Sequence, residues 1–271
     1  MEFRIGCSGW SYKGWNGAFY PKGTKPSDYL ELYSRAFDTV EIDSTFYAIP
    51  DSGTVRSWRE RTPDNFLFTA KVPKIVTHER KLENTEVHMG YFLESIGKLG
   101  DKLGMILVQF PHGFTYDSGA EKFRKFLERL PTDARFAVEF RHDSWFNDAA
   151  YACLKENNVT LAWSEVPMTG STNITTSSSA YVRLVGDRSI KEEDFGTVRR
   201  DRTDVINRWA RELENKKNVI DHTFVFSNNH FQGFGPATVN FFRQAVGVEP
   251  VNWEIRMKNT STGEQKSLFD W

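Results

Sequence analysis

Eight short apolar runs with the character of β-strands recur along the chain, and this feature restricts its fold most strongly. They cover residues 3–7, 39–43, 66–71, 105–110, 136–141, 160–163, 181–185 and 223–228. Segments with apolar residues at helical spacing lie between most of them, at residues 26–37, 85–99, 120–130, 148–157, 203–215 and 236–246. Because parallel strands need a long crossover connection, this alternation predicts a parallel sheet covered by helices.

The number of strand–helix units favours a single (β/α)8 TIM barrel. The chain has 271 residues, and barrels of this kind commonly have about 250. The sixth crossover is irregular, because residues 167–179 are rich in Ser and Thr and lack helical spacing, which leaves an open α/β sheet as the alternative. We expect one barrel domain over residues 1–250. Residues 251–271 follow the last predicted helix, and their turn-rich segment 259–264 predicts an extended C-terminal tail.

Charge and composition exclude several classes of protein. The 35 Lys and Arg residues balance 36 Asp and Glu residues, so no overall field attracts nucleic acid or an anionic membrane. Cys7 and Cys153 are the two cysteines and form no disulfide or zinc pattern. The sequence has no apolar run of about 18 residues, and residues 1–10 lack a signal-peptide pattern. We therefore expect a cytoplasmic protein with no membrane partner.

Polar residues alternate with apolar ones in the predicted strands. In the second strand Val40 and Ile42 share one face, while Glu41 and Asp43 share the other. The apolar face suits the layer between sheet and helices, which leaves the polar face for the lumen of the barrel. Most of these polar residues come late in their strands, at the end where barrel enzymes place their active sites. The alternation therefore predicts a site at that end.

The polar residues suggest a set of roles. Glu41 and Glu139 are predicted as an acid/base pair, with His78 as a further catalytic residue. The residues predicted to bind an anionic substrate are Lys71, Arg141 and Arg183, supported by Gln109, Asn228, Asn229, Trp10, Tyr12 and Tyr47. The alternative is a buried ion network in which the charges only satisfy one another.

No cofactor is predicted from the sequence. It has no HExxH, no phosphate-binding glycine loop and no nucleophile elbow. A divalent metal held by His78 or His142 together with the two glutamates is an alternative to acid/base chemistry alone. We consider a loop histidine bonded to the backbone the better explanation of each imidazole.

Several ordered motifs along the barrel resemble a known family. They cover residues 6–12, 15–21, 40–47, 68–71 with 77–78, 103–111, 138–142 with 144–145, 181–184 and 227–229. In these stretches the chain resembles the YecE-like family, the TIM-barrel domain of unknown function 72. The family usually has Arg-Leu-His-Gly in the seventh strand, and this chain has Val185 in place of the histidine. The resemblance implies the barrel fold and implies no particular reaction.

The last residues of the sequence form a recognisable peptide. Gln265, Leu268, Phe269 and Trp271 are spaced as in the peptides that bind sliding clamps, to which the segment is similar. Short peptides of this kind insert a few apolar anchors into a groove. The alternative is that these side chains pack on the barrel itself.

Three functions remain open at this stage. The first is an enzyme, for example a hydrolase of a phosphodiester or a glycoside, that uses carboxylate acid/base chemistry on an anionic substrate. The second is a sliding-clamp-tethered protein of DNA maintenance, such as a nuclease. The third is a barrel that binds a ligand without catalysis.

Overall fold

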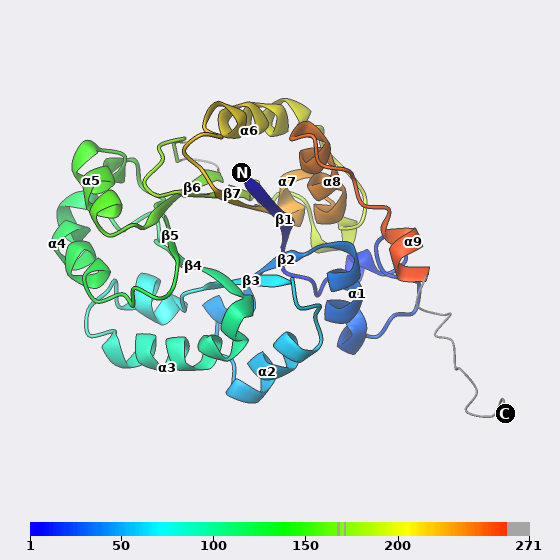
Figure 1. Cartoon of the computed structure of the whole chain (residues 1–271), viewed down its shortest axis with the longest axis horizontal. Helices are drawn as coiled ribbons and strands as arrows, with labels where there is room; N and C mark the ends of the chain where they lie inside the picture. Colours follow the sequence, from blue (N-terminus) through cyan, green and yellow to red (C-terminus); the bar gives the residue numbers. More distant parts are fainter. Residues whose placement is uncertain (167–168, 171, 259–271) are drawn as a thin grey trace.

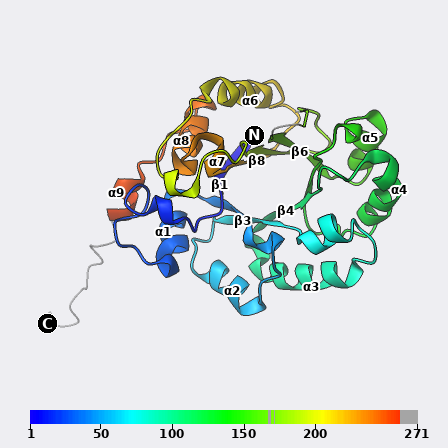
Figure 2. The same cartoon turned by 180° about the vertical axis from the view of Figure 1, so that it is seen from behind.

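The computed structural model describes residues 1–166, 169–170 and 172–258. Eight parallel strands close into a barrel in sequence order, and helices surround them (Figures 1 and 2). The strands are β1 Glu2–Ser8, β2 Thr39–Ile42, β3 Leu67–Lys71, β4 Leu103–Gln109, β5 Phe136–Glu139, β6 Thr160–Glu165, β7 Ser179–Leu184 and β8 His222–Ser227. The closed barrel confirms the predicted fold and excludes the open sheet.

The outer layer consists of α-helices with short helical turns in the loops. The α-helices are α1 Tyr29–Ala36, α2 Ser52–Glu60, α3 Glu86–Ile96, α4 Tyr116–Leu127, α5 Asp148–Glu156, α6 Thr203–Asn215, α7 Asn229–Gln232, α8 Gly235–Ala245 and α9 Trp253–Lys258. The short turns are η1 Lys13–Trp15, η2 Pro26–Asp28, η3 Ser44–Phe46, η4 Ile75–Glu79, η5 Gly97–Lys102, η6 Asp143–Trp145 and η7 Glu192–Asp194.

Helix α2 was not predicted from the sequence. Within it only Val55 is buried and Trp58 packs partly buried on the core, so the segment has few apolar residues from which a helix could be recognised. Its N-terminus is held by Asp51, whose side chain accepts a hydrogen bond from the backbone N–H of Thr54 at 2.9 Å. The helix therefore depends on capping and on its neighbours more than on its own apolar pattern.

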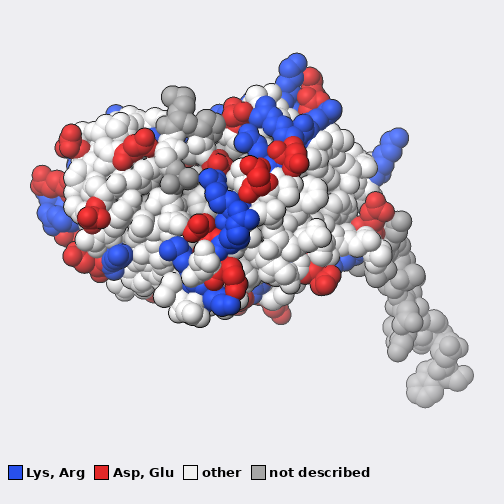
Figure 3. All heavy atoms as spheres, turned by 90° about the horizontal axis from the view of Figure 1, so that it is seen from above, with Lys and Arg blue, Asp and Glu red and all other residues white. Residues whose placement is uncertain are grey.

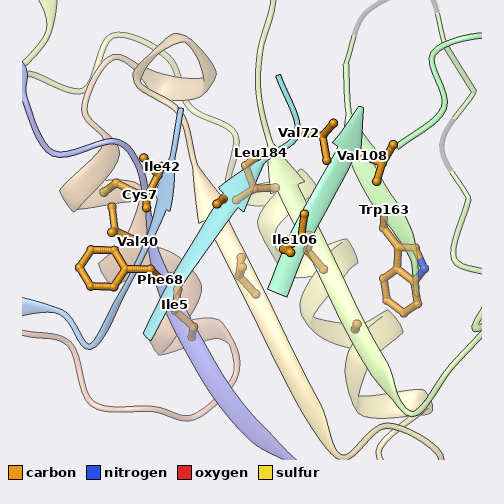
Figure 4. Packing of buried hydrophobic residues seen from close by; sticks show 14 of the residues in the cluster. Ile5, Cys7, Val40, Ile42, Phe68, Val72, Ile106, Val108, Trp163 and Leu184 are labelled. Carbon is orange, nitrogen blue, oxygen red and sulfur yellow. The ribbon is translucent and has the colours of Figure 1, made fainter. Parts of the chain in front are cut away.

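The two faces of each strand have different environments. Side chains such as Val40, Ile42, Ile106 and Val108 pack into the main hydrophobic core (Figure 4). Their alternate neighbours point into the lumen, as the period of two requires. The lower part of the lumen is filled by a separate apolar cluster of Met105, Leu107, Ala137, Ala162, Tyr181, Phe224 and Phe226. The barrel is thus closed below the polar residues at the strand ends.

The sixth crossover and the C-terminal segment differ from the rest of the barrel. No helix occurs between β6 and β7 among the described residues 166, 169–170 and 172–178, as the sequence predicted. Within the predicted tail, Val251 is buried and α9 packs on α1. The ring of Trp253 lies 5.6 Å from that of Phe19. The first part of residues 251–271 is therefore packed against the barrel.

The clamp-binding peptide predicted at Gln265, Leu268, Phe269 and Trp271 lies outside the described residues. None of the helices that the structure describes combines the length and apolar character needed to cross a bilayer.

Candidate functional site

A cavity of about 990 Å³ lies at the carboxyl ends of the barrel strands. Residues from the end of β3, from the end of β4 and from the loops after β5, β7 and β8 line it. Parallel barrels place the last side chains of all their strands at this end, so residues far apart in sequence meet there. Of the residues predicted for the site, the cavity is lined by Tyr12, Tyr47, Lys71, His78, Gln109, Arg141, Arg183 and Asn228.

Directly beneath the cavity lies a buried set of polar side chains, here called the inner layer. It consists of Ser8, Glu41, Thr69, Glu139, Tyr181 and Arg183. Arg183 donates to both oxygens of Glu41, from Nε to Oε2 at 2.8 Å and from Nη2 to Oε1 at 2.7 Å. The other lone pairs of Glu41 accept from Ser8 Oγ and Tyr181 Oη, each at 2.8 Å. Glu41 therefore has no acceptor capacity left for a substrate.

Glu139 joins the inner layer to the cavity. One of its oxygens accepts from Arg183 Nη1, and the other accepts from Arg141 Nε at 2.6 Å. Gln109 Oε1 accepts weakly from both arginines, at 3.3 Å in each case. The two guanidinium groups are thus held in fixed positions by a shared carboxylate and a shared amide.

Both glutamates remain ionised in this arrangement. Burial alone would raise the pKa of Glu41, but the charges of Arg183 and Lys71 and the hydrogen bonds it accepts lower its pKa to about 2. Burial likewise opposes ionisation of Glu139, and the charges of Arg141, Arg183 and Lys71 overcome it and lower the pKa to about 2. Neither carboxyl group carries a proton to donate near neutral pH.

The predicted acid/base pair does not fit this geometry. Glu41 and Glu139 are fully buried, and neither lines the cavity. Each is bonded to Arg183, and four of the five N–H donors of Arg183 face these carboxylates or Gln109. The alternative given by the sequence, a network in which the charges satisfy one another, describes this inner layer better. Through Glu139 and Gln109, this network holds the side chain of Arg141 in position at the cavity.

Lys71, His78 and Arg141 line the cavity above the inner layer and have unsatisfied polar capacity, and we call these three side chains the rim. The ammonium group of Lys71 lies 2.6 Å from Asp43 Oδ1 and 5.8 Å from the ring centre of Phe46. Arg141 uses Nε and Nη2, whereas its Nη1 has no acceptor among the described residues. The rim therefore offers N–H donors that no described side chain occupies.

His78 stands beside these two cations on the π-helical turn η4. Its Nδ1 is 2.8 Å from Thr77 Oγ1, and its ring meets that of Phe46 edge to face at 4.9 Å. Burial, and then the charges of Arg141 and Lys71, lower the pKa of His78 to about 4. The imidazole is therefore neutral at pH 7 and can accept or donate a proton at the cavity.

Two of the residues predicted to bind substrate have a structural position instead. Trp10 packs edge to face on Trp58 at 5.6 Å and does not line the cavity. Asn229 is buried, and its Oδ1 accepts from Trp15 Nε1 at 2.9 Å and from the backbone N–H of Gly235 at 2.8 Å. Asn229 therefore links the first loop to the start of α8.

Several residues of the cavity were not among the predicted site residues. They include Asp43, Phe46, His112, Arg188, Phe195 and His230. The alternation in the second strand had placed Asp43 on the lumen face, so that residue was within reach of the sequence argument. The others lie in the connections that follow the strands, Phe46 in the short turn η3, His230 in the one-turn helix α7 and the rest in loops, and these connections have no sequence period from which a position follows.

No metal site is formed by the residues that the structure describes. Within these ranges no group of three or more His, Cys, Asp or Glu side chains gathers as ligands. The carboxylates considered for such a site, Glu41 and Glu139, are bonded to arginines, and Nδ1 of His142 accepts from the backbone N–H of Ser144 at 3.2 Å. The residues present do not fit the predicted alternative of a divalent metal.

Charge is mixed on the outer surface. On the face shown in Figure 3, Lys and Arg are interspersed with Asp and Glu, in agreement with the balanced composition. An anion would therefore be attracted by the local donors of the cavity rather than by the field of the whole molecule.

Fold and site together define the chain as a (β/α)8 barrel with a charged cavity at the carboxyl ends of its strands. Residues 4–263 match the family described as "Protein of unknown function DUF72". The chain belongs to this family, as the sequence motifs had indicated. The name of the family assigns no activity.

Relatives and solved structures agree with this result. The chain is 33% identical over 117 residues to the UPF0759 protein YecE of Escherichia coli strain K12, an alignment that covers 43% of each chain. It is 31% identical over 153 residues to the UPF0759 protein YunF of Bacillus subtilis strain 168, covering 54% of this chain and 53% of that one. The chain thus spans about half the length of the curated relatives it matches.

Two solved DUF72 structures have the same fold. The protein from Thermotoga maritima MSB8 has a TM-score of 0.79 and 27% identity, covering 91% of this chain and 100% of that chain. The protein from Enterococcus faecalis V583 has a TM-score of 0.74 and 20% identity, covering 92% and 96%. At 20% identity the second likeness concerns the fold alone.

Proposed function

We propose that this protein binds a small molecule bearing a phosphate or carboxylate group at the rim, and that His78 transfers a proton to or from it. The observation that carries the proposal is the arrangement of Lys71 and Arg141. Both line the cavity, and both have N–H donors without a described acceptor. Lys71 is held by its ion pair with Asp43, and Arg141 is held by its hydrogen bond to Glu139. Paired donors of this kind suit the oxygens of an anion, and the guanidinium offers them in a planar fork.

The electrostatics of His78 support a catalytic role on such a ligand. The charges of Lys71 and Arg141 contribute to its low pKa. A bound anion would offset these charges, so the pKa of His78 would rise toward its usual value when the site is filled. The histidine would then be a more effective proton acceptor with the ligand present than without it. This coupling favours an enzyme over the alternative of a barrel that only binds its ligand.

Calorimetric titration with inorganic phosphate tests the binding step. We expect the wild-type protein to bind phosphate and Arg141→Gln to bind it at least about tenfold more weakly, a difference of about 1.4 kcal/mol. Arg124→Gln is the matched control, because Arg124 is an exposed arginine on α4 that pairs with Glu128. Equal affinity in wild type and Arg141→Gln, or an equal loss in the control, would contradict the proposal.

Native mass spectrometry of the purified protein addresses the substrate. We expect a co-purified mass that carries phosphate or carboxylate and that is lost in Arg141→Gln. A ligand that stays chemically unchanged during prolonged incubation with the protein would favour the non-catalytic barrel over the enzyme.

The clamp-binding peptide remains a separate proposal from the sequence. The family match ends at residue 263, before Gln265, so the peptide lies outside the region that defines the family. Removal of residues 264–271 is expected to abolish association with a purified sliding clamp in calorimetry. Unchanged association of the truncated protein would end this proposal and leave the anion site unaffected.

A further inference from the structure

A further cationic residue, Arg188, lines the same cavity. Arg188 lies in the loop after β7, and it has no hydrogen bond or ion pair with any residue that the structure describes. Lys71 ends β3, four strands away in a closed ring of eight. Phe195, Tyr12 and His230 line the cavity as well, and the ring of Phe195 contacts that of Tyr12 at 5.9 Å and that of His230 at 5.0 Å.

The backbone at Arg188 is held in a conformation that a residue with a side chain rarely adopts. Its φ is +59°, in the left-handed region, which costs free energy for any residue except glycine and is least unfavourable for Asn and Asp. Strained residues of this kind persist where the surroundings enforce them, and they are concentrated at functional sites.

The neighbours of Arg188 enforce this conformation. Asp187 Oδ1 accepts from the backbone N–H of Ser189 at 3.1 Å and from its hydroxyl at 2.6 Å, and Asp187 Oδ2 accepts from Arg200 Nη1 at 2.7 Å. Gly186 has a φ of +80° and packs so closely that an added Cβ would lie 2.2 Å from the backbone oxygen of His230. The loop is therefore braced on both sides of Arg188.

The environment of Arg188 parallels that of the rim. A half-buried imidazole, His230, lies beside it, as His78 lies beside Lys71 and Arg141. Burial, together with the charge of Arg188, lowers the pKa of His230. Neither of the acidic residues near Arg188 forms an ion pair with it. Asp187 is paired with Arg200, and Glu192 makes no described contact with Arg188. Lys191, which also lines the cavity, is 3.5 Å from Glu193.

From this arrangement we propose that the cavity takes a molecule with two separate anionic groups, one bound at the rim and the other by Arg188. The inference rests on the proposed function and specifies its substrate class. Lys71 of the rim and Arg188 belong to opposite strand–loop units of the ring and line one cavity of about 990 Å³, whose lining also includes the aromatic side chains of Tyr12, Phe46 and Phe195. A spacer that joins the two anions brings the second group to Arg188 at high effective concentration once the first is bound.

The experiment compares ligands with one and with two anionic ends. The probes are alkane bisphosphonates with two to six carbons between the phosphorus atoms, and alkyl monophosphonates of equal carbon number. In calorimetry we expect wild-type protein to bind one bisphosphonate length at least about tenfold more tightly than the matching monophosphonate. Arg188→Asn should reduce this advantage to less than about twofold, while its affinity for the monophosphonate stays within about twofold of wild type.

Three further variants make the result specific. Asn tolerates the left-handed region, so Arg188→Asn should not lower the melting temperature. Arg188→Lys keeps the charge and should retain part of the bisphosphonate advantage. Arg199→Asn is the matched control, because Arg199 lies in the same connection from β7 to α6 and pairs with Asp194 at 2.7 Å. Arg141→Gln should weaken the binding of both kinds of probe.

The outcomes separate the two proposals. If neither probe binds the wild-type protein, the proposed function fails together with this inference. If the monophosphonate binds and no bisphosphonate length is preferred, or if the preference survives in Arg188→Asn, the two-anion inference is overturned and the rim site stands.

Discussion

Arg183 in the inner layer and Arg141 at the rim lie two strands apart and share Glu139, yet their surroundings differ. Arg183 is 2% exposed and directs four N–H donors at described acceptors. The side chain of Arg141 is 18% exposed and directs two N–H donors at described acceptors. A saturated guanidinium stabilises the barrel, whereas a partly satisfied one at a cavity can bind a ligand. Residue type alone does not distinguish these two roles.

The titratable groups of the two regions, the glutamates of the inner layer and His78 at the rim, also differ. The inner carboxylates are held ionised by the cations around them, while the same cations help to hold His78 neutral. One group of positive charges thus keeps the two glutamates ionised and helps to keep the imidazole of His78 neutral near pH 7. The four predictions that follow test this division between the inner layer and the rim.

The largest effect is expected from Arg183→Met. The substitution preserves most of the side-chain volume but leaves two buried carboxylates without their shared cation. Breaking a buried ion pair by removal of one partner costs about 3–5 kcal/mol. Urea denaturation at pH 7 should show a loss of this size. In the exposed control Arg124→Met the loss should be within about 0.5 kcal/mol, and a similar loss in both variants would remove the distinction.

Acidification should destabilise the inner layer next. The folded pKa of Glu41 and of Glu139 is about 2, below the ordinary value of 4.5. Because the unfolded chain binds more protons in this window, stability is fully present above pH 4.5 and falls as the pH drops toward 2. Each carboxylate contributes about 3 kcal/mol in this way. Urea denaturation between pH 6 and pH 3 should show the decline.

Glu139→Gln provides the control for this pH dependence. The variant is less stable at pH 7 and has one titrating group fewer, so its stability should fall less steeply between pH 4.5 and pH 3. An identical slope in wild type and variant would show that other carboxylates govern acid unfolding.

A smaller loss of stability is expected for Arg141→Gln. The rim arginine gives up a hydrogen bond to a charged partner, while Glu139 keeps its contact with Arg183. A cost of about 1.5 kcal/mol is expected at pH 7, less than half of that for Arg183→Met. Measured in the same urea series, a cost equal to that of Arg183→Met would place both arginines in one structural network and weaken the case for a binding site.

The smallest effect is expected at His78. An NMR titration of its imidazole should give a midpoint near pH 4. Between this pH and 6.5 the unfolded chain binds more protons at His78, so acidification through this window lowers stability. The loss is smaller than that of a buried carboxylate, because His78 is partly exposed and solvent screens its charge. Arg141→Gln removes a neighbouring cation and should raise the midpoint, and so should saturating phosphate. A midpoint that phosphate leaves unchanged would show that no anion binds beside His78.

The barrel could be predicted from the sequence because its causes are local and periodic. Alternation within Val40-Glu41-Ile42-Asp43 assigns faces to the second strand, and helical spacing between strands predicts the outer layer. The same alternation predicted that Glu41, Glu139 and Arg183 point into the lumen, where the structure brings them together. Helix α2 was missed because it contains few apolar residues, of which only Val55 is buried.

The sequence by itself determined the barrel, the polar character of its strand ends and the balance of charge around them, since these follow from side-chain period and composition. Only the tertiary structure decided which charges are saturated. Hydrogen-bond partners such as Ser8, Tyr181 and Arg183 reach Glu41 from two other strands, β1 and β7, and burial depends on how deep each residue lies in the closed ring. Neither the depth of a residue in the barrel nor the number of its hydrogen-bond partners can be read from the sequence. For this reason the two glutamates resembled catalytic residues in the sequence, whereas the structure places them in the inner layer.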